Sequence, residues 1–327
     1  MRLFRIFLLS AGLLLAGTVT LQAAVQRDST GFQYQYISGR KYYRLYDIAR
    51  YMRLKLYKNG SRYELNGTRG RMVFTPDKRY GSFNGTVLNY DFVPVVRGGE
   101  LYISSADFFN HLQVLFLPVS LHPLGVRTIL IDPGHGGKDQ GASGRFSKEK
   151  DLTLQISMRL QRILRKMGYR VYVTRNSDRK IELSDRARAG TSIKADMFIS
   201  IHMNAAANRS VRGIETFALT APGAPSSGTV KVDYTKYPGN AALGNSYFLA
   251  WNVQTQLIKN MRANDRGVKQ ARFVVLRESR CPSILIECGF ISNYYDEKLL
   301  NDPAYQERLA LSVAWGIYYY HMNLRRR

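Results

Sequence analysis

Three short apolar runs, each leading into a potential metal ligand or acid–base residue, most constrain what this chain can form. The runs span 128–135, 196–202 and 283–287 and lead to His135, His202 and Glu287. Runs rich in β-branched and apolar residues, bounded by Gly, Pro or polar residues, are typical of buried strands. In open α/β sheets, ligands collect beyond the carboxyl ends of the strands. The three residues therefore predict one shared site with the outline of a catalytic metal site.

Alternating strand and helix patterns after residue 126 predict an α/β fold for residues 126–327. Apolar residues recur with helical period in several segments, and helices are expected at 152–167, 181–194, 245–261 and 303–323. Further strands are expected at 170–174 and 213–219. The segment 221–244 is rich in Pro, Gly and Ser and is expected to form a long surface excursion. The predicted architecture is a mixed, largely parallel sheet flanked by helices.

The preceding segment, residues 25–120, is rich in Tyr and Phe and contains frequent Asn-Gly and Gly-Gly pairs. Such pairs at short intervals predict hairpins. A weak internal repeat, in which 39–54 matches 98–112, predicts a strand, a short helix and a strand in each copy. This pattern resembles the copper amine oxidase-like N-terminal repeat of secreted bacterial enzymes, without implying copper here. We expect a small β-rich α+β accessory domain for targeting or scaffolding.

Residues 1–23 have the features of a secretory signal peptide: a basic start, an apolar stretch and a small-residue cleavage point. A transmembrane anchor is the competing interpretation, because the apolar stretch is only slightly shorter than the ~20 residues of a span. The small residues within the stretch and the polar chain that comes after it favour cleavage. We therefore expect an exported protein, periplasmic or extracellular and associated with the cell wall, with no stable membrane anchor after cleavage.

The net charge is +24, and the basic excess is spread over both halves of the chain. Basic proteins attract polyanions. For an exported protein these are anionic polymers of the cell envelope, so nucleic acid is not expected as a partner.

A third metal ligand is expected besides the two histidines, because catalytic zinc typically takes three protein ligands and leaves a position for water. Glu149 follows His135 across a Gly-rich loop, residues 136–144, that lets the chain turn back over the sheet edge. Glu149 can thus reach the same point as His135 and His202. Glu287 is then free to act as general base on the metal-bound water.

Spacing alone leaves other assignments open. Asp132 and Asp139 are rival ligands, and a single His is more often structural than a ligand. Glu149 lies in the charged segment 148–151, which is also typical of a solvated helix start. Glu287 is harder to explain structurally, because a carboxylate at the end of a buried strand is unfavourable without a partner.

Several motifs occur together in one order along the chain. They are Ile131-Asp-Pro-Gly-His-Gly-Gly-Lys-Asp-Gln-Gly141, Glu149-Lys-Asp-Leu152, Thr174-Arg175 with Asp178 and Arg186, Ser200-Ile-His-Met-Asn-Ala205, Gly213-Ile-Glu-Thr-Phe217 and Ile286-Glu-Cys-Gly-Phe-Ile-Ser-Asn293. Over residues 126 to about 322, the chain resembles the zinc-dependent N-acetylmuramoyl-L-alanine amidases of bacterial cell walls, the amidase-3 group.

The resemblance implies one catalytic Zn²⁺ held by His135, Glu149 and His202, with Glu287 as the catalytic acid–base residue. The implied substrate is peptidoglycan, and the implied reaction is hydrolysis of the amide between N-acetylmuramic acid and L-alanine. Two other functions remain open from the sequence. One is a catalytically silent peptidoglycan-binding protein, and the other is a zinc carboxypeptidase acting on wall peptides. Some relatives carry a helix that plugs the zinc site, but the apolar pattern of 247–261 favours a packed core helix.

Overall fold

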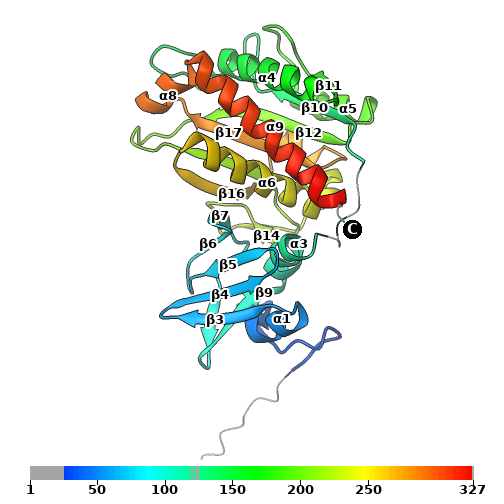
Figure 1. Cartoon of the computed structure of the whole chain (residues 1–327), viewed down its shortest axis with the longest axis vertical. Coiled ribbons are helices and arrows are strands. Elements are labelled where there is room, and N and C mark those ends of the chain that lie inside the picture. The colour runs from blue at the N-terminus through cyan, green and yellow to red at the C-terminus, as the bar shows by residue number, and fades with distance from the viewer. Residues whose placement is uncertain (1–25, 119–120, 122–124, 326–327) are drawn as a thin grey trace, which may run out of the picture.

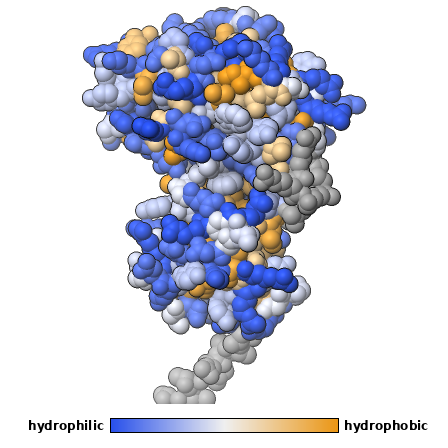
Figure 2. Space-filling view, in the orientation of Figure 1, coloured by the Kyte–Doolittle hydropathy of each residue, from blue (hydrophilic) through white to orange (hydrophobic). Residues whose placement is uncertain are grey.

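The computed structural model describes residues 26–118, 121 and 125–325 (Figure 1). The predicted signal peptide lies outside the described residues. A larger body formed by the C-terminal residues and a smaller N-terminal body meet at a narrower waist (Figure 2). None of the helices in the described part of the chain combines the length and apolar character that a membrane span requires.

The C-terminal body is built on six neighbouring strands of one sheet. Their spatial order is β11 (Arg170–Val173), β10 (Thr128–Pro133), β12 (Met197–Asn204), β17 (Ser283–Phe290), β13 (Ile214–Leu219) and β16 (Asp265–Ala271). The first four strands are parallel to one another, β13 is antiparallel to β17, and β16 is parallel to β13. The predicted mixed, largely parallel sheet is confirmed. Sequence reasoning missed β16, because its alternating polar residues form no apolar run.

Alternate residues of the central strands pack on opposite faces of the sheet. Ile129 and Ile131 belong to the main core, whereas Leu130 between them belongs to a second cluster with Phe198 and Leu285. Burial on both faces explains why these strands are continuous apolar runs rather than alternating ones. The main core is covered by the helices α4 (Glu149–Lys166), α6 (Leu243–Met261) and α9 (Pro303–Arg325), with α8 (Tyr294–Leu300) beside them (Figure 1). The second cluster is covered by α5 (Leu183–Ser192) and α7 (Val274–Arg277).

The N-terminal body contains a four-stranded antiparallel sheet and a five-stranded meander. The first has the order β1 (Tyr34–Ile37), β2 (Arg40–Arg44), β9 (Glu100–Ser104) and β8 (Val95–Arg97). The second runs through β3 (Lys55–Asn59), β4 (Arg62–Gly67), β5 (Gly70–Phe74), β6 (Tyr80–Phe83) and β7 (Thr86–Asn89).

The two copies of the predicted repeat share their first strand and helical start but end differently. The first copy gives β2, α1 (Leu45–Tyr51) and β3, as expected. The second gives β9 and then α2 (Ser105–Asp107), η1 (Phe108–Leu112) and α3 (Gln113–Phe116), so its predicted closing strand is wrong. Apolar residues of this helical segment, including Phe108, Leu112 and Leu115, are buried in the main core, which favours helix over strand here.

The two bodies share one sheet, because β7 pairs in parallel with β16 through Leu88 and Val268. The main core also contains residues of both bodies. The 221–244 excursion, which includes β14 (Ala224–Pro225), β15 (Val232–Asp233) and η3 (Pro238–Ala242), packs at this junction. There the Arg79 side chain donates hydrogen bonds to the carbonyl oxygens of Pro225 and Thr229. The division into domains at 120–126 stays a prediction, and the junction is a packed interface.

Candidate metal centre

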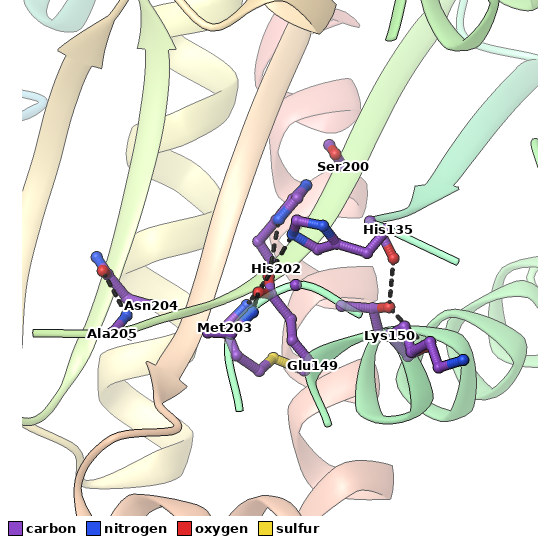
Figure 3. A network of polar contacts seen from close by, with 12 residues as sticks. His135, Glu149, Lys150, Ser200, His202, Met203, Asn204 and Ala205 are labelled. Carbon is purple, nitrogen blue, oxygen red and sulfur yellow. Dashed lines mark hydrogen bonds and ion pairs between the residues drawn. The ribbon is translucent and has the colours of Figure 1, made fainter. Parts of the chain in front are cut away.

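The structure brings His135, Glu149 and His202 together at the carboxyl edge of the sheet. One ligand atom from each lies within 4.8 Å of the others. His135 Nε2 is 3.2 Å from Glu149 Oε2, and His202 Nδ1 is 2.9 Å from Glu149 Oε1. Figure 3 shows the two imidazoles and the carboxylate directed toward one another. The predicted trio therefore forms one cluster, drawn from the end of β10, the start of α4 and β12.

Local backbone geometry permits this close approach. His135 has a positive φ of 60°, a conformation that turns the chain sharply after β10. Gly134 has no room for a side chain, because a Cβ there would lie 2.4 Å from the His202 ring. At Gly141, which has a φ of +64°, a Cβ would lie 2.5 Å from Glu149 Oε2. Glycine at positions 134 and 141 is thus needed to let the two histidines and the glutamate lie this close together.

Glu149 is held as a carboxylate by backbone donors and by the histidines. The N–H groups of Met203 and Ala142 donate to its oxygens at 3.0 and 2.8 Å. Burial alone raises the pKa of Glu149, but the hydrogen bonds with His135 and His202 outweigh it and hold the pKa well below its ordinary value. Glu149 is the first residue of α4, so its position at a helix start also favours the charged form.

The rival ligands have other roles in the structure. Asp139 Oδ1 lies 2.9 Å from His135 Nδ1, so it orients the imidazole and leaves Nε2 directed at Glu149. Asp132 is fully buried and accepts hydrogen bonds from the side chains of Thr174, Arg186 and Ser200. It connects β10 to its neighbours beneath the cluster.

Glu287 lies beside the cluster within β17, three residues before the strand ends. It is the register partner of His202 on β12 and of Glu215 on β13. Burial, followed by the negative charges of Glu149 and Glu215, raises the pKa of Glu287 well above its ordinary value. Its Oε2 has no hydrogen-bond partner among the described residues. A buried carboxyl with a free oxygen and a raised pKa is suited to exchange a proton near neutral pH.

The positions of His202 and Glu287 along their strands differ from the sequence-based prediction, and a role for Glu215 was not predicted. His202 and Glu287 were predicted at strand ends, but β12 and β17 continue to Asn204 and Phe290. Glu215 had no predicted role, although it lies in one of the recognised motifs. Its carboxylate pairs with Arg266 and Lys269, so a further buried carboxylate, held by two cationic side chains, lies beside Glu287. Glu215 is a glutamate inside an otherwise apolar run, and this sequence pattern could have indicated its role.

The residues present fit a catalytic zinc ion. Two imidazoles and one carboxylate are a usual ligand set for such an ion, which keeps one further position for water. The side chains of His135 and His202 are 25% and 18% exposed, so the cluster can be reached from solvent. Glu287 Oε2, which has no hydrogen-bond partner among the described residues, belongs to the strand next to that of His202.

An α/β sheet that carries two histidines and a carboxylate at its carboxyl edge, with a second buried carboxyl beside them, is typical of metal-dependent hydrolases. The comparison with protein families agrees and is more specific. Residues 129–319 match the Amidase_3 family, described as N-acetylmuramoyl-L-alanine amidase. The chain belongs to this family, and the resemblance predicted from its motifs is confirmed.

Individual relatives and solved structures support the assignment. AmiC, an N-acetylmuramoyl-L-alanine amidase of Escherichia coli O6:H1, is 36% identical over an alignment of 214 residues, which covers 58% of this chain and 51% of the relative. AmiA of Escherichia coli K12 is 34% identical over 223 residues, covering 60% of this chain and 77% of AmiA. The structure of an N-acetylmuramoyl-L-alanine amidase from Clostridium difficile 630 has a TM-score of 0.51 and 35% identity, covering 60% of this chain and 97% of that one. The chain thus spans about half the length of AmiC.

Proposed function

We propose that this chain hydrolyses the amide bond between N-acetylmuramic acid and L-alanine in peptidoglycan, with one zinc ion held by His135, Glu149 and His202. The observation that carries the proposal is the arrangement of these ligands beside Glu287, which is in register with His202. A bound zinc ion supplies Lewis acidity, which lowers the pKa of water and polarises a carbonyl oxygen.

Side chains at and around the ligand set have separate roles in the reaction. Glu149 brings one negative charge to the ligand set, and Asp139 keeps the His135 imidazole in its orientation. Glu287 is the acid–base residue: its free Oε2 accepts a proton from the attacking water and delivers it to the nitrogen of the departing L-alanine. Burial, followed by the negative charges of Glu149 and Glu215, raises the pKa of Glu287, which favours proton transfer in both directions.

Digestion of purified sacculi by the full chain tests the reaction. An amidase must release intact stem peptides that begin with L-alanine, which mass spectrometry identifies. Glu287→Gln is the matched control, because it preserves the shape of the side chain and removes its acid–base function. A protein that binds sacculi and releases nothing would be a silent binding protein. Shortened stems that remain on the glycan would indicate a carboxypeptidase.

We also propose that the protein is exported and acts at the cell wall, with residues 1–23 removed as a signal peptide. The proposal is supported by the basic and apolar composition of that segment and by a substrate that lies outside the cytoplasm. N-terminal sequencing of the protein isolated from its cells tests it. A mature chain that still begins at Met1 would support the anchor interpretation instead. The basic surface would also favour contact with anionic polymers of the envelope.

A further inference from the structure

A hollow of about 390 Å³ lies on the C-terminal body, at the edge of the sheet that also carries the candidate metal centre. It is lined by the segments that contain Arg145, Arg209 and Tyr294. These segments follow β10, β12 and β17, the strands that lead to His135, His202 and Glu287. In Figure 1, α8, which begins at Tyr294, lies beyond the end of β17.

Short connections join this hollow to the metal centre. The N–H of Ala142 donates to Glu149 Oε2 at 2.8 Å, and the next residue, Ser143, already lines the hollow. On the other side, the N–H of Ile291 donates to the carbonyl oxygen of Asn204, two residues after His202. The hollow and the metal centre are therefore formed by the same three strands, β10, β12 and β17, and the segments that follow them, at the same edge of the sheet.

Hydrogen bonds hold the walls of the hollow in place. Asn293 Nδ2 donates to the carbonyl oxygen of Arg209 at 2.7 Å, which ties the loop after β12 to the start of α8. Glu297 on α8 accepts hydrogen bonds from the backbone N–H groups of Arg145, Phe146 and Ser147 at 2.8–3.0 Å. Walls fixed in this way lose little conformational entropy when a ligand binds.

The hollow presents positive charge. Both oxygens of Glu297, its only acidic lining residue, are already engaged by the backbone of 145–147. The guanidinium groups of Arg145 and Arg209 have no acidic partner among the described residues, unlike Arg186, which pairs with Asp132. Tyr294 and Tyr295, 49% and 63% exposed, add aromatic surface at the rim.

We propose that this hollow binds carboxylate groups of the peptide that begins with the scissile L-alanine, through Arg145 and Arg209. The proposal rests on the proposed amidase function and extends it to the substrate. The planar guanidinium matches a carboxylate with two parallel hydrogen bonds. The limited volume of about 390 Å³ and the position at the same sheet edge as the metal centre favour a short acidic peptide over an extended anionic polymer.

Peptide binding to the full chain tests this assignment without requiring turnover. The probes are a labelled tetrapeptide with L-alanine at its amino end and free carboxylates, and the same peptide with those carboxylates amidated. We expect Arg145→Gln combined with Arg209→Gln to weaken binding of the acidic peptide about tenfold or more, and wild type to bind the amidated peptide equally weakly. In sacculus digestion the same variant should raise KM and leave kcat unchanged.

A matched control removes two arginine charges from another hollow of the protein. Arg188 and Arg280 line a separate hollow formed by α5 and the segment before β17, and Arg188→Gln combined with Arg280→Gln should bind the acidic peptide as wild type does. Equal affinity of the Arg145/Arg209 variant and wild type for the acidic peptide would overturn the proposal. So would a variant that loses affinity only for a phosphate-bearing wall polymer. If sacculi are not cleaved but peptide affinity still depends on Arg145 and Arg209, the amidase function fails and the peptide site stands.

Discussion

Two clusters of carboxylates and histidine occur in the described part of the chain, one at the candidate metal centre and one at the junction of the two bodies. The junction cluster consists of Asp91, Asp107 and His111. Both clusters bring potential ligand atoms within 4.8 Å of one another. They differ in exposure and in the partners of their polar atoms.

The junction cluster is closed and largely occupied by donors from the protein. Asp107 accepts hydrogen bonds from the N–H groups of Asp91 and Phe92, and His111 Nδ1 lies 3.0 Å from Asp107 Oδ1. The His111 ring stacks on Tyr247 of α6, with 4.2 Å between ring centroids. The side chains of His111 and its two aspartates are at most 2% exposed. These contacts join the N-terminal body to the C-terminal body.

The candidate metal centre differs in being open to solvent. A buried carboxyl oxygen without a hydrogen-bond partner occurs at both places, Glu287 Oε2 at one and Asp91 Oδ1 at the other. The comparison teaches that proximity of histidines and carboxylates does not by itself indicate catalysis. Access from solvent decides which of the two clusters is suited to chemistry.

The largest expected effect is loss of a ligand at the metal centre. His202→Ala should remove the bound zinc and reduce amidase activity to background, a loss of more than about 10⁴-fold. Elemental analysis of the purified protein and sacculus digestion measure the two effects. His111→Ala is the matched change in the other cluster and should keep the zinc content. If His111→Ala abolished zinc binding and His202→Ala did not, the junction cluster and not the candidate metal centre would be the zinc site.

Glu287→Gln should separate metal binding from catalysis. Because Glu287 is beside the ligands and not among them, the variant should retain zinc while kcat falls about 10²–10⁴-fold, the usual contribution of a general base. Steady-state kinetics on a soluble muropeptide, together with zinc content, measure this. Wild-type kcat in this variant would remove Glu287 from the reaction.

Asp107→Ala should lower the stability of the protein and leave the catalytic activity of the folded molecule unchanged. The change leaves the N–H groups of Asp91 and Phe92 and the His111 ring without their acceptor, and we expect it to lower the free energy of unfolding by about 3–5 kcal/mol. Denaturant unfolding of the full chain measures the loss. Activity per folded molecule and zinc content should match wild type. A variant of unchanged stability would show that the cluster does not hold the bodies together.

The smallest expected effect is a pH dependence of stability from His111. Burial and Arg79 lower the pKa of His111, but Asp91 and Asp107 outweigh them and raise it above its ordinary 6.5. The folded state therefore binds this proton more tightly than the unfolded state does. Its stabilising contribution is fully present below about pH 6.5 and is lost as pH rises through the folded-state pKa. Relative to His111→Gln, wild type should lose stability as pH rises through this range, as unfolding at a series of pH values would show. Parallel profiles for the two proteins would contradict the assignment.

The sequence was sufficient for those parts of the fold that are buried on both faces. Runs such as 128–133 and 283–287 must be strands within a layered sheet, because their apolar residues need cover on both sides. The Gly-rich loop 136–144 was recognisable from its composition, because clustered glycines indicate a tight turn of the chain. The strand β16 and the partners of Glu215 were not recognisable, since the polar residues of β16 and Glu215 are accommodated by partners distant in sequence, such as Lys269 with Glu215.

The sequence by itself determined the class of sheet, the family and the residues that compete for the metal. Only the tertiary structure separated those competitors, because the role of a carboxylate depends on the donors that surround it. Asp132 is enclosed by the side chains of Thr174, Arg186 and Ser200, Asp139 orients an imidazole, and Glu149 faces both histidines. The continuity of the sheet from β16 into β7 was likewise decided by tertiary structure, because backbone pairing between distant segments leaves no periodic signal in either segment.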